Sequence, residues 1–170
     1  MQAEQRRQAV LDILQQSAQA VSAGALAARF SVSRQVIVGD IALLRAAGAE
    51  ISATPRGYVV QSSPAGLVRQ LACRHDAAGM EAELNAIVDN GCTALDVIVE
   101  HPIYGQLTGA LQLSNRYDVQ QFIRRTLDAD ARPLSDLTCG IHLHTLSCPD
   151  EAAYQRVKTA LHSMEILLED

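Results

Sequence analysis

The sequence predicts an α+β protein with two domains: an N-terminal three-helix unit with a β-hairpin, residues 1–63, and a C-terminal α/β sandwich, residues 64–170. Apolar residues recur at helical spacing up to Gly48 and then follow mixed strand and helix patterns. A polar, turn-forming run, residues 61–66, separates the two regions. The length of 170 residues accommodates two small domains, and 48% apolar with 19% charged residues excludes a disordered chain.

The net charge of −5 at first argues against a nucleic-acid partner. The charge is unevenly divided, because residues 1–63 hold six arginines and four acidic residues, a balance of +2, which leaves −7 for the remainder. The first domain therefore keeps such a partner open. No run approaches the roughly 18 apolar residues of a membrane span, and the charged N-terminus lacks the apolar core of a signal peptide, so we expect a cytoplasmic protein with no membrane partner.

Three short helices are predicted in the first domain. Residues 4–16 contain neither Gly nor Pro and form the first helix. Ser22 can cap a second helix of about nine residues, and Ser33 can cap a third that ends at Gly48. The tight turn between the second and third helices makes a helix-turn-helix. The third helix is expected to bury Val36, Ile37, Ile41 and Leu44.

A small hairpin follows Gly48, with its turn at residues 55–57 and a β-rich run at residues 58–60. A hairpin packed behind the third helix is a wing. The combined pattern resembles the winged helix-turn-helix of biotin-repressor-like and related bacterial regulators, over essentially the whole first domain. The residues that carry this resemblance are Ser33-Arg34-Gln35-Val36-Ile37, Asp40-Ile41, Leu44-Arg45, Gly48 and Arg56-Gly57-Tyr58.

The start of the third helix is the candidate DNA-recognition surface. A recognition helix presents its first turn to base edges in the major groove, so Ser33, Arg34 and Gln35 are predicted to contact bases or phosphates. Arg45 and Arg56 are predicted to contact the DNA backbone. The alternative is a small domain that binds protein, with these as ordinary exposed polar residues. Because a charge of +2 is modest, we expect a homodimer on a palindromic operator.

The second domain shows patterns in the order β-α-β-β-α-β-α. That order predicts helices on one side of a mostly antiparallel sheet, and it is ferredoxin-like. The expected strands are residues 67–73, 94–100, 107–113 and 140–146, and the expected helices are residues 77–89, 115–127 and 151–168.

Histidines mark the candidate chemical site. Strand alternation places His142 and His144 on one face, about 7 Å apart, where they can chelate one divalent ion. The alternative is a pair exposed on a solvent face. His75 follows the first strand, Glu81 and Glu83 lie in the next helix, and first and last strands are often neighbours in such sheets. Three imidazoles and a carboxylate suit nickel, zinc, iron or manganese.

These histidines belong to a longer pattern. Its pieces are His75, His101-Pro102-Ile103-Tyr104-Gly105, residues 114–119, residues 133–138 and Gly140-Ile141-His142-Leu143-His144-Thr145. The pattern resembles the three-histidine domain of bacterial niacin-responsive repressors, in which that domain follows a winged helix. The resemblance spans nearly the full chain and implies a dimeric transcription repressor of NAD biosynthesis or niacin uptake genes, with nicotinic acid as co-repressor. It also implies the metal ligands His75, Glu83, His142 and His144.

An effector pocket is expected near His101, Tyr104 and Arg116. Nicotinic acid or a related pyridine needs a cationic or metal partner for its carboxylate and a flat apolar surface for its ring. Alternatively, Pro102 fixes a turn in which His101 is hydrogen-bonded, and Arg116 is a solvated residue at a helix start.

The cysteines are scattered without a Cys-x-x-Cys pair, and we expect Cys73, Cys92, Cys139 and Cys148 to be reduced and mostly buried. The resembled family commonly has a small residue where this chain has Cys139. A thiol beside the strand of His142 is either a bystander or alters the metal preference, so the ion stays open.

No enzymatic activity is expected, because the site follows a DNA-binding module and no hydrolase motif such as His-Glu-x-x-His appears. Two alternatives stay open. One is a repressor that senses the metal itself, without a niacin effector. The other is a metal-dependent hydrolase fused to a DNA-binding module, since a bound ion can activate water.

Overall fold

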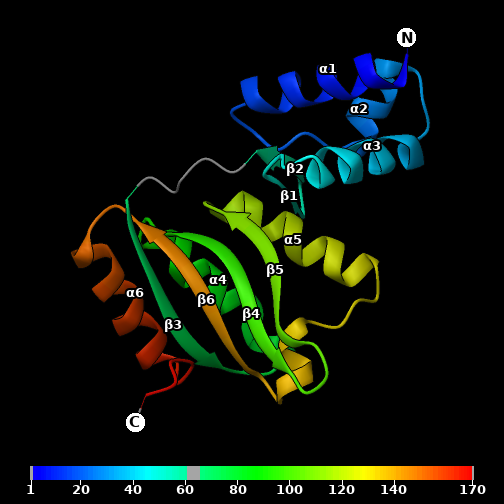
Figure 1. Cartoon of the computed structure of the whole chain (residues 1–170). Coiled ribbons are helices and arrows are strands. Elements are labelled where there is room, and N and C mark those ends of the chain that lie inside the picture. Colours follow the sequence, from blue (N-terminus) through cyan, green and yellow to red (C-terminus); the bar gives the residue numbers. More distant parts are fainter. Residues whose placement is uncertain (1, 61–65, 170) are drawn as a thin grey trace. The chain divides into compact units, whose positions relative to one another are not determined.

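The computed structural model describes residues 2–60 and 66–169 (Figure 1). The chain divides into two compact units, residues 1–63 and 64–170, and each unit has its own buried apolar core. The predicted linker lies outside the described residues except for Gly66. No helix in the described part of the chain is long and apolar enough to cross a membrane.

The first unit confirms the predicted helices and hairpin. Side-chain caps set where two helices begin, because Ser22 Oγ accepts a hydrogen bond from the Ala25 N–H at 3.0 Å and Ser33 Oγ accepts one from the Val36 N–H at 3.3 Å. Val36 itself is 37% exposed, so the predicted stripe buries only its other three members. The elements are α1 (Ala3–Gln16), α2 (Ala23–Phe30), α3 (Arg34–Ala46), β1 (Ile51–Thr54) and β2 (Gly57–Val60).

A largely buried ion pair joins α1 to α3. Arg6 Nε donates to Asp40 Oδ2 at 2.6 Å, and Arg6 Nη2 donates to Oδ1 at 3.2 Å. This two-point contact satisfies a carboxylate that is only 4% exposed. Arg6, one of the six arginines of the first unit, is therefore engaged in a contact within that unit.

The second unit is a four-stranded sheet with helices. Its strands are ordered β3-β6-β4-β5, and every neighbouring pair is antiparallel. First and last strands are therefore neighbours, as expected. The pairing departs from the ferredoxin-like arrangement, because the unit's last strand, rather than its third, lies between the first and second. The elements are β3 (Leu67–Arg74), the 3-10 helix η1 (Ala77–Gly79), α4 (Met80–Asp89), β4 (Thr93–His101), β5 (Gly105–Leu113), α5 (Arg116–Asp128), the 3-10 helix η2 (Leu134–Thr138), β6 (Ile141–Cys148) and α6 (Glu151–Ser163).

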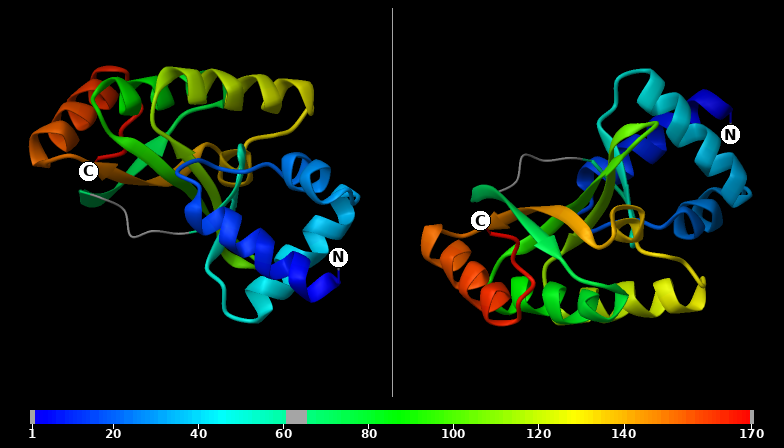
Figure 2. Two further views of the ribbon diagram at one scale, coloured as in Figure 1. Left: turned by 90° about the horizontal axis from the view of Figure 1, so that it is seen from above. Right: turned by 90° about the horizontal axis from the view of Figure 1, so that it is seen from below.

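Helices α4, α5 and α6 lie together along one face of the sheet (Figure 2). The core of the unit fills the space between these two layers, and Leu84 and Ile87 of α4 are buried there with Leu146 of β6. Along β6, alternate residues His142, His144, Leu146 and Cys148 are buried. The helix-covered face of β6 is therefore the face that carries both histidines.

The last helix is shorter than predicted. It ends at Ser163 because the chain beyond it turns to the edge strand β3. Arg74 N–H donates to the Ile166 carbonyl at 2.8 Å, and Leu168 N–H donates to the Ala72 carbonyl at 2.9 Å. Pairing of this kind covers the exposed edge of a sheet.

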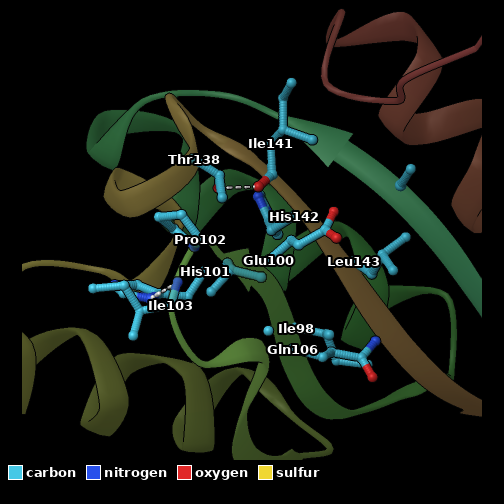
Figure 3. A pocket seen from close by; sticks show the side chains of 13 residues that line it. Ile98, Glu100, His101, Pro102, Ile103, Gln106, Thr138, Ile141, His142 and Leu143 are labelled. Carbon is cyan, nitrogen blue, oxygen red and sulfur yellow. Dashed lines mark hydrogen bonds between the residues drawn. The ribbon is translucent and has the colours of Figure 1, made fainter.

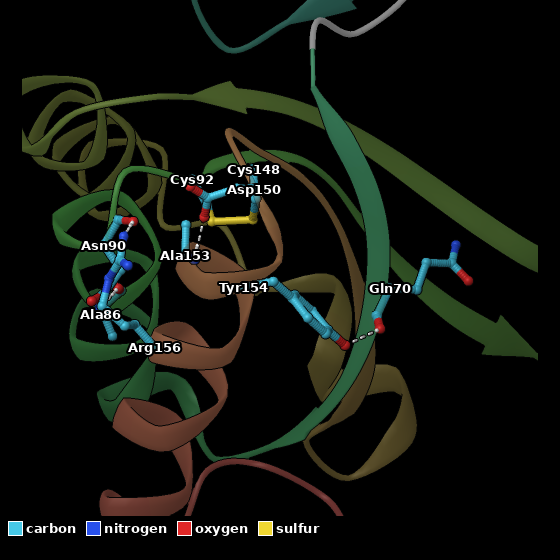
Figure 4. Close-up of a disulfide and its surroundings, with 9 residues drawn as sticks. All are labelled: Gln70, Ala86, Asn90, Cys92, Cys148, Asp150, Ala153, Tyr154 and Arg156. Carbon is cyan, nitrogen blue, oxygen red and sulfur yellow. Dashed lines mark hydrogen bonds between the residues drawn. A yellow bond between two sulfur atoms is a disulfide. The ribbon is translucent and has the colours of Figure 1, made fainter.

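A disulfide joins Cys92 to Cys148, so the expectation of reduced cysteines is wrong for these two (Figure 4). The cause is strand register. Thr93 of β4 pairs with Ser147 of β6, which sets the two cysteines opposite one another with their Cα atoms 4.3 Å apart. Their separation of 56 residues hides this pairing from the sequence. The free cysteines are Cys73, which is buried, and Cys139, which is exposed.

Candidate functional site

Four predicted ligand residues converge between the sheet and α4. The Nε2 atom of His75, just after β3, lies 2.6 Å from Oε2 of Glu83 on α4. From β6, His142 Nε2 lies 3.1 Å from Glu83 Oε1, and His144 Nε2 lies 3.3 Å from Glu83 Oε2. Glu83 is 1% exposed, whereas Glu81 is exposed at the start of the same helix.

Backbone carbonyls orient all three imidazoles. His75 Nδ1 donates to the Asp76 carbonyl at 2.6 Å and His142 Nδ1 to the Gly140 carbonyl at 2.8 Å. His144 Nδ1 donates to the Asp96 carbonyl at 2.6 Å. Because a carbonyl only accepts, each Nδ1 carries a proton, and Nε2 is the ring nitrogen that faces Glu83. Metal-ligating histidines are held in this way.

This donor set fits a divalent transition ion. A carboxylate also only accepts, so hydrogen bonds from all three Nε2 atoms would need three imidazolium ions around one buried carboxylate. A cation among these atoms satisfies the lone pairs and the carboxylate together. Nitrogen and oxygen donors of this type suit nickel, zinc, iron and manganese alike.

The electrostatics of the group are strongly coupled. Burial raises the pKa of Glu83, but the charge of His144 and hydrogen bonds from the imidazoles hold that pKa well below its usual range. Burial lowers the pKa of His75 and of His144, and the Glu83 carboxylate more than compensates, so both values are raised. The site therefore favours positive charge next to Glu83.

Two glycines allow the backbone to close around His75. Gly140 has φ +88°, and a Cβ there would lie 2.3 Å from the His75 carbonyl oxygen. A Cβ on Gly79 would lie 2.8 Å from the His75 Cβ and Cγ. A Cβ atom does not approach non-bonded atoms this closely, so a larger residue at either position would displace His75.

Cys73 belongs to the same group, although the sequence pattern did not single it out. It pairs directly with His142 in the β3–β6 register. Its Sγ, a Glu83 carboxylate oxygen and a His142 ring nitrogen all lie within 4.8 Å of one another. Burial, with Glu83 beside it, raises the pKa of the thiol. The available signal was Cys73-x-His75, which has the spacing of His142-x-His144 on the neighbouring strand.

Cys139, the thiol that the sequence did raise, is exposed at the end of η2. It lines a polar pocket of about 620 Å³ beside His75, which also includes Arg74 and Arg132.

A larger pocket of about 1060 Å³ lies where β4 turns into β5 (Figure 3). His101 and Pro102 line it from the turn, and Ile98, Ile141 and Leu143 supply apolar walls. Residues alternate along a strand, so Ile141 and Leu143 lie on the face of β6 opposite the ligand histidines. His142 also borders the pocket, and β6 thus contributes to both sites.

The predicted effector residues are only partly brought together. His101 Nδ1 accepts hydrogen bonds from the N–H groups of Ile103 at 3.1 Å and Tyr104 at 3.3 Å, so it closes the turn while lining the pocket. Tyr104 is 74% exposed, with its ring centroid 5.0 Å from that of His101. Arg116 lies at the start of α5, where both Nε and Nη2 donate to Asp89, and it is not among the residues that line this pocket.

The start of α3 offers an exposed polar surface. Ser33, Arg34 and Gln35 are all exposed, and the Ser33 hydroxyl already accepts the capping hydrogen bond. Val38, one turn further along, is also exposed at 43%. Exposed polar and apolar side chains along the first two turns of α3 can contact base edges.

Of the two other residues predicted to contact DNA, Arg45 is hydrogen-bonded within the first unit and Arg56 is only partly exposed. Arg45 Nε donates to the Ile51 carbonyl at 2.7 Å, and its guanidinium carbon lies 5.9 Å from the Tyr58 ring centroid. Arg45 therefore fastens α3 to the hairpin. Arg56 lies in the hairpin turn and is half-buried.

Both parts of the chain match known protein families. Residues 6–59 match the HTH domain family and residues 68–170 match the 3H domain family. The chain is 41% identical over 167 residues to the probable transcription repressor NiaR of Thermotoga maritima, covering 98% of this chain and 95% of that protein. It is 43% identical over 169 residues to the transcription repressor NadR of Bacillus subtilis, covering 97% and 94%.

Both relatives are named transcription repressors, which is consistent with the expectation of no enzymatic activity. The exposed start of α3 gives the first unit the geometry for DNA binding that such a role requires. The chain belongs to the family of DNA-binding transcription repressors in which an HTH domain precedes a 3H domain.

Proposed function

We propose that this repressor controls genes of NAD biosynthesis or niacin uptake, with nicotinic acid as co-repressor and a divalent metal ion in the 3H domain. The observation that carries the proposal is the convergence of three Nε2 atoms on Glu83, each ring held by a backbone carbonyl. The names NadR and NiaR of two relatives support the link to NAD and niacin.

His75, Glu83, His142 and His144 would hold the ion, and nickel, zinc, iron and manganese all remain candidates. When bound, the ion would supply positive charge that offsets the buried Glu83 carboxylate and would fix the three imidazoles. The carbonyls of Asp76, Gly140 and Asp96 keep the imidazoles oriented before any ion arrives, which lowers the cost of binding.

We place the effector in the pocket lined by His101. Ile98 and Leu143 offer an apolar surface to a pyridine ring, and His101 offers a polar contact. The polar pocket beside His75 is the competing location, because Arg74 and Arg132 line it and can pair with a carboxylate, although Asp76, Asp136 and Glu165 line it as well. Arg116 is the least supported of the predicted effector residues, since Asp89 already occupies its guanidinium.

We propose a homodimer as the operator-binding form. Arg6 is held by Asp40 and Arg45 by the Ile51 carbonyl, so a single first unit brings few cations to phosphates. Two copies double those contacts and match a palindromic site. Effector binding would then shift the dimer towards a spacing of the two α3 helices that fits adjacent major grooves.

The test begins with operator DNA selected from a random duplex library by the full-length protein with metal and nicotinic acid present. Fluorescence anisotropy then measures operator affinity in four conditions: with and without nicotinic acid, each with and without chelator. Nicotinic acid is expected to raise affinity roughly 5- to 150-fold in the metal-loaded protein and not after chelation. Metal-dependent binding that ignores nicotinic acid would instead establish the metal sensor.

Two variants locate the effector within the same assay. His101→Ala should abolish the response to nicotinic acid while basal DNA binding is kept, and Arg132→Ala should leave the response intact. The reverse result would move the effector to the pocket beside His75. Light scattering of the protein with and without operator checks the dimer.

A further inference from the structure

We infer that Cys73 is a further ligand of the ion, so that the site combines imidazole, carboxylate and thiolate donors. This inference rests on the metal-holding role proposed above. It concerns a residue outside the predicted ligand set, and it narrows which ion the site takes.

Strand register sets Cys73 beside His142. Cys73 and His142 are direct partners in the antiparallel pairing of β3 with β6, and both side chains are buried on the helix-covered face. In this antiparallel register His144 lies opposite Leu71, and His75 follows the end of β3, where its N–H donates to the Gly140 carbonyl at 3.3 Å. Glu83 of α4 closes the group from the helix layer.

The ligand atoms of Cys73, Glu83 and His142 are close enough to share one ion. Cys73 Sγ, a Glu83 oxygen and a His142 nitrogen lie within 4.8 Å of one another, and Glu83 also contacts the other two imidazoles. Donors about 2.0 to 2.3 Å from a common zinc ion lie at separations below this limit. Cys73 is 0% exposed, so its thiol is directed into the protein and not to solvent.

A thiolate changes the selectivity of the site. On coordination the Sγ–H bond breaks, the proton passes to solvent, and Sγ bonds to the ion as a thiolate. Thiolates favour softer ions such as zinc, whereas manganese prefers oxygen donors. Cys73 would therefore disfavour manganese among the four candidate ions, a distinction that imidazoles and a carboxylate alone do not make.

Cobalt(II) substitution of the full-length protein tests this directly, because a thiolate ligand adds an intense near-ultraviolet charge-transfer band to the cobalt spectrum. The measurement is made without reductant, so that Cys92 and Cys148 stay in their disulfide. We expect the band in the wild type and in the control Cys139→Ser, and we expect its loss in Cys73→Ser while visible cobalt transitions persist. Circular dichroism verifies that the variants are folded.

Metal competition provides a second readout. The ratio of zinc to manganese affinity should fall in Cys73→Ser by about tenfold. Substitution of a residue that only supports a ligand already lowers metal affinity by about this factor. A wild type that binds cobalt without the charge-transfer band would overturn the role of Cys73 and leave the metal centre standing. Loss of the band in Cys139→Ser, but not in Cys73→Ser, would also overturn it. No cobalt binding at all would overturn both proposals.

Discussion

The DNA-recognition surface and the histidine group are built in opposite ways. Ser33, Arg34 and Gln35 are adjacent in sequence and exposed at one helix start, so their placement depends on a single cap. The histidine group (His75, Glu83, His142 and His144) instead draws side chains from the segment after β3, from α4 and from β6 into a buried space. An exposed surface can thus change without disturbing the fold, whereas each member of the buried group depends on strand pairing and on its neighbours.

The largest effect is expected from removing the Cys92–Cys148 disulfide, which links two residues of the second unit. Replacing Cys92 and Cys148 by Ser should lower the unfolding free energy of residues 64–170 by about 4 kcal/mol, because a closed loop of this size restricts the unfolded chain. Hydrogen exchange resolved by region should show faster global exchange in the second unit only. Equal acceleration in the first unit would contradict the independence of the two units.

Next in size is the loss of the central carboxylate. Glu83→Gln should lower zinc affinity by about 100-fold, because it removes the negative charge that all three imidazoles face. Isothermal titration calorimetry measures this change. Glu81→Gln, on the exposed side of the same helix, serves as the matched control and should bind zinc like the wild type.

A smaller effect is expected at the exposed surface. Arg34→Ala should weaken operator binding by about 1–3 kcal/mol without altering the melting temperature or the metal affinity. Arg124→Ala removes the same charge from an exposed position of the second unit and should leave operator binding unchanged. If Arg34→Ala reduced metal affinity, the separation of the two sites would be wrong.

The smallest effects are expected from a glycine-to-alanine substitution, made once in α3 and once beside His75. Gly39 of α3 has no atom within 4 Å of an added Cβ, so Gly39→Ala should raise the unfolding free energy of the first unit by roughly 0.5–1 kcal/mol. Gly79→Ala would push against His75 and should lower zinc affinity by about tenfold. Thermal melts and zinc titrations of both variants check this pair, and unchanged zinc binding in Gly79→Ala would show that His75 is not held by packing.

Local chemistry explains which parts of the fold were predictable. The caps Ser22, Ser33 and Asn115 act within three residues of themselves, so the helix starts were correctly predicted. The end of α6 was not, because residues 166–168 leave the helix to bond with β3, more than 90 residues earlier. The periodicity of one segment carries no information about such a partner.

The same distinction between local and long-range contacts applies to the candidate site. The face shared by His142 and His144 follows from alternation within one strand, whereas the position of Cys73 beside His142 and the disulfide both follow from register between strands distant in sequence. Arg45 is a further case, since its bond to the Ile51 carbonyl depends on how the hairpin folds against α3.

The burial of the histidine group limits how fast a bound ion can exchange with solvent. Glu83, His142 and His144 are almost inaccessible, and the His75 side chain, 8% exposed, is the least covered of the four. An ion held there can leave only when the protein opens locally, so its residence should be long compared with exchange of a small molecule in the open pocket at His101. The ion would then persist through many rounds of effector binding, as a fixed part of the receptor rather than as a second fluctuating signal.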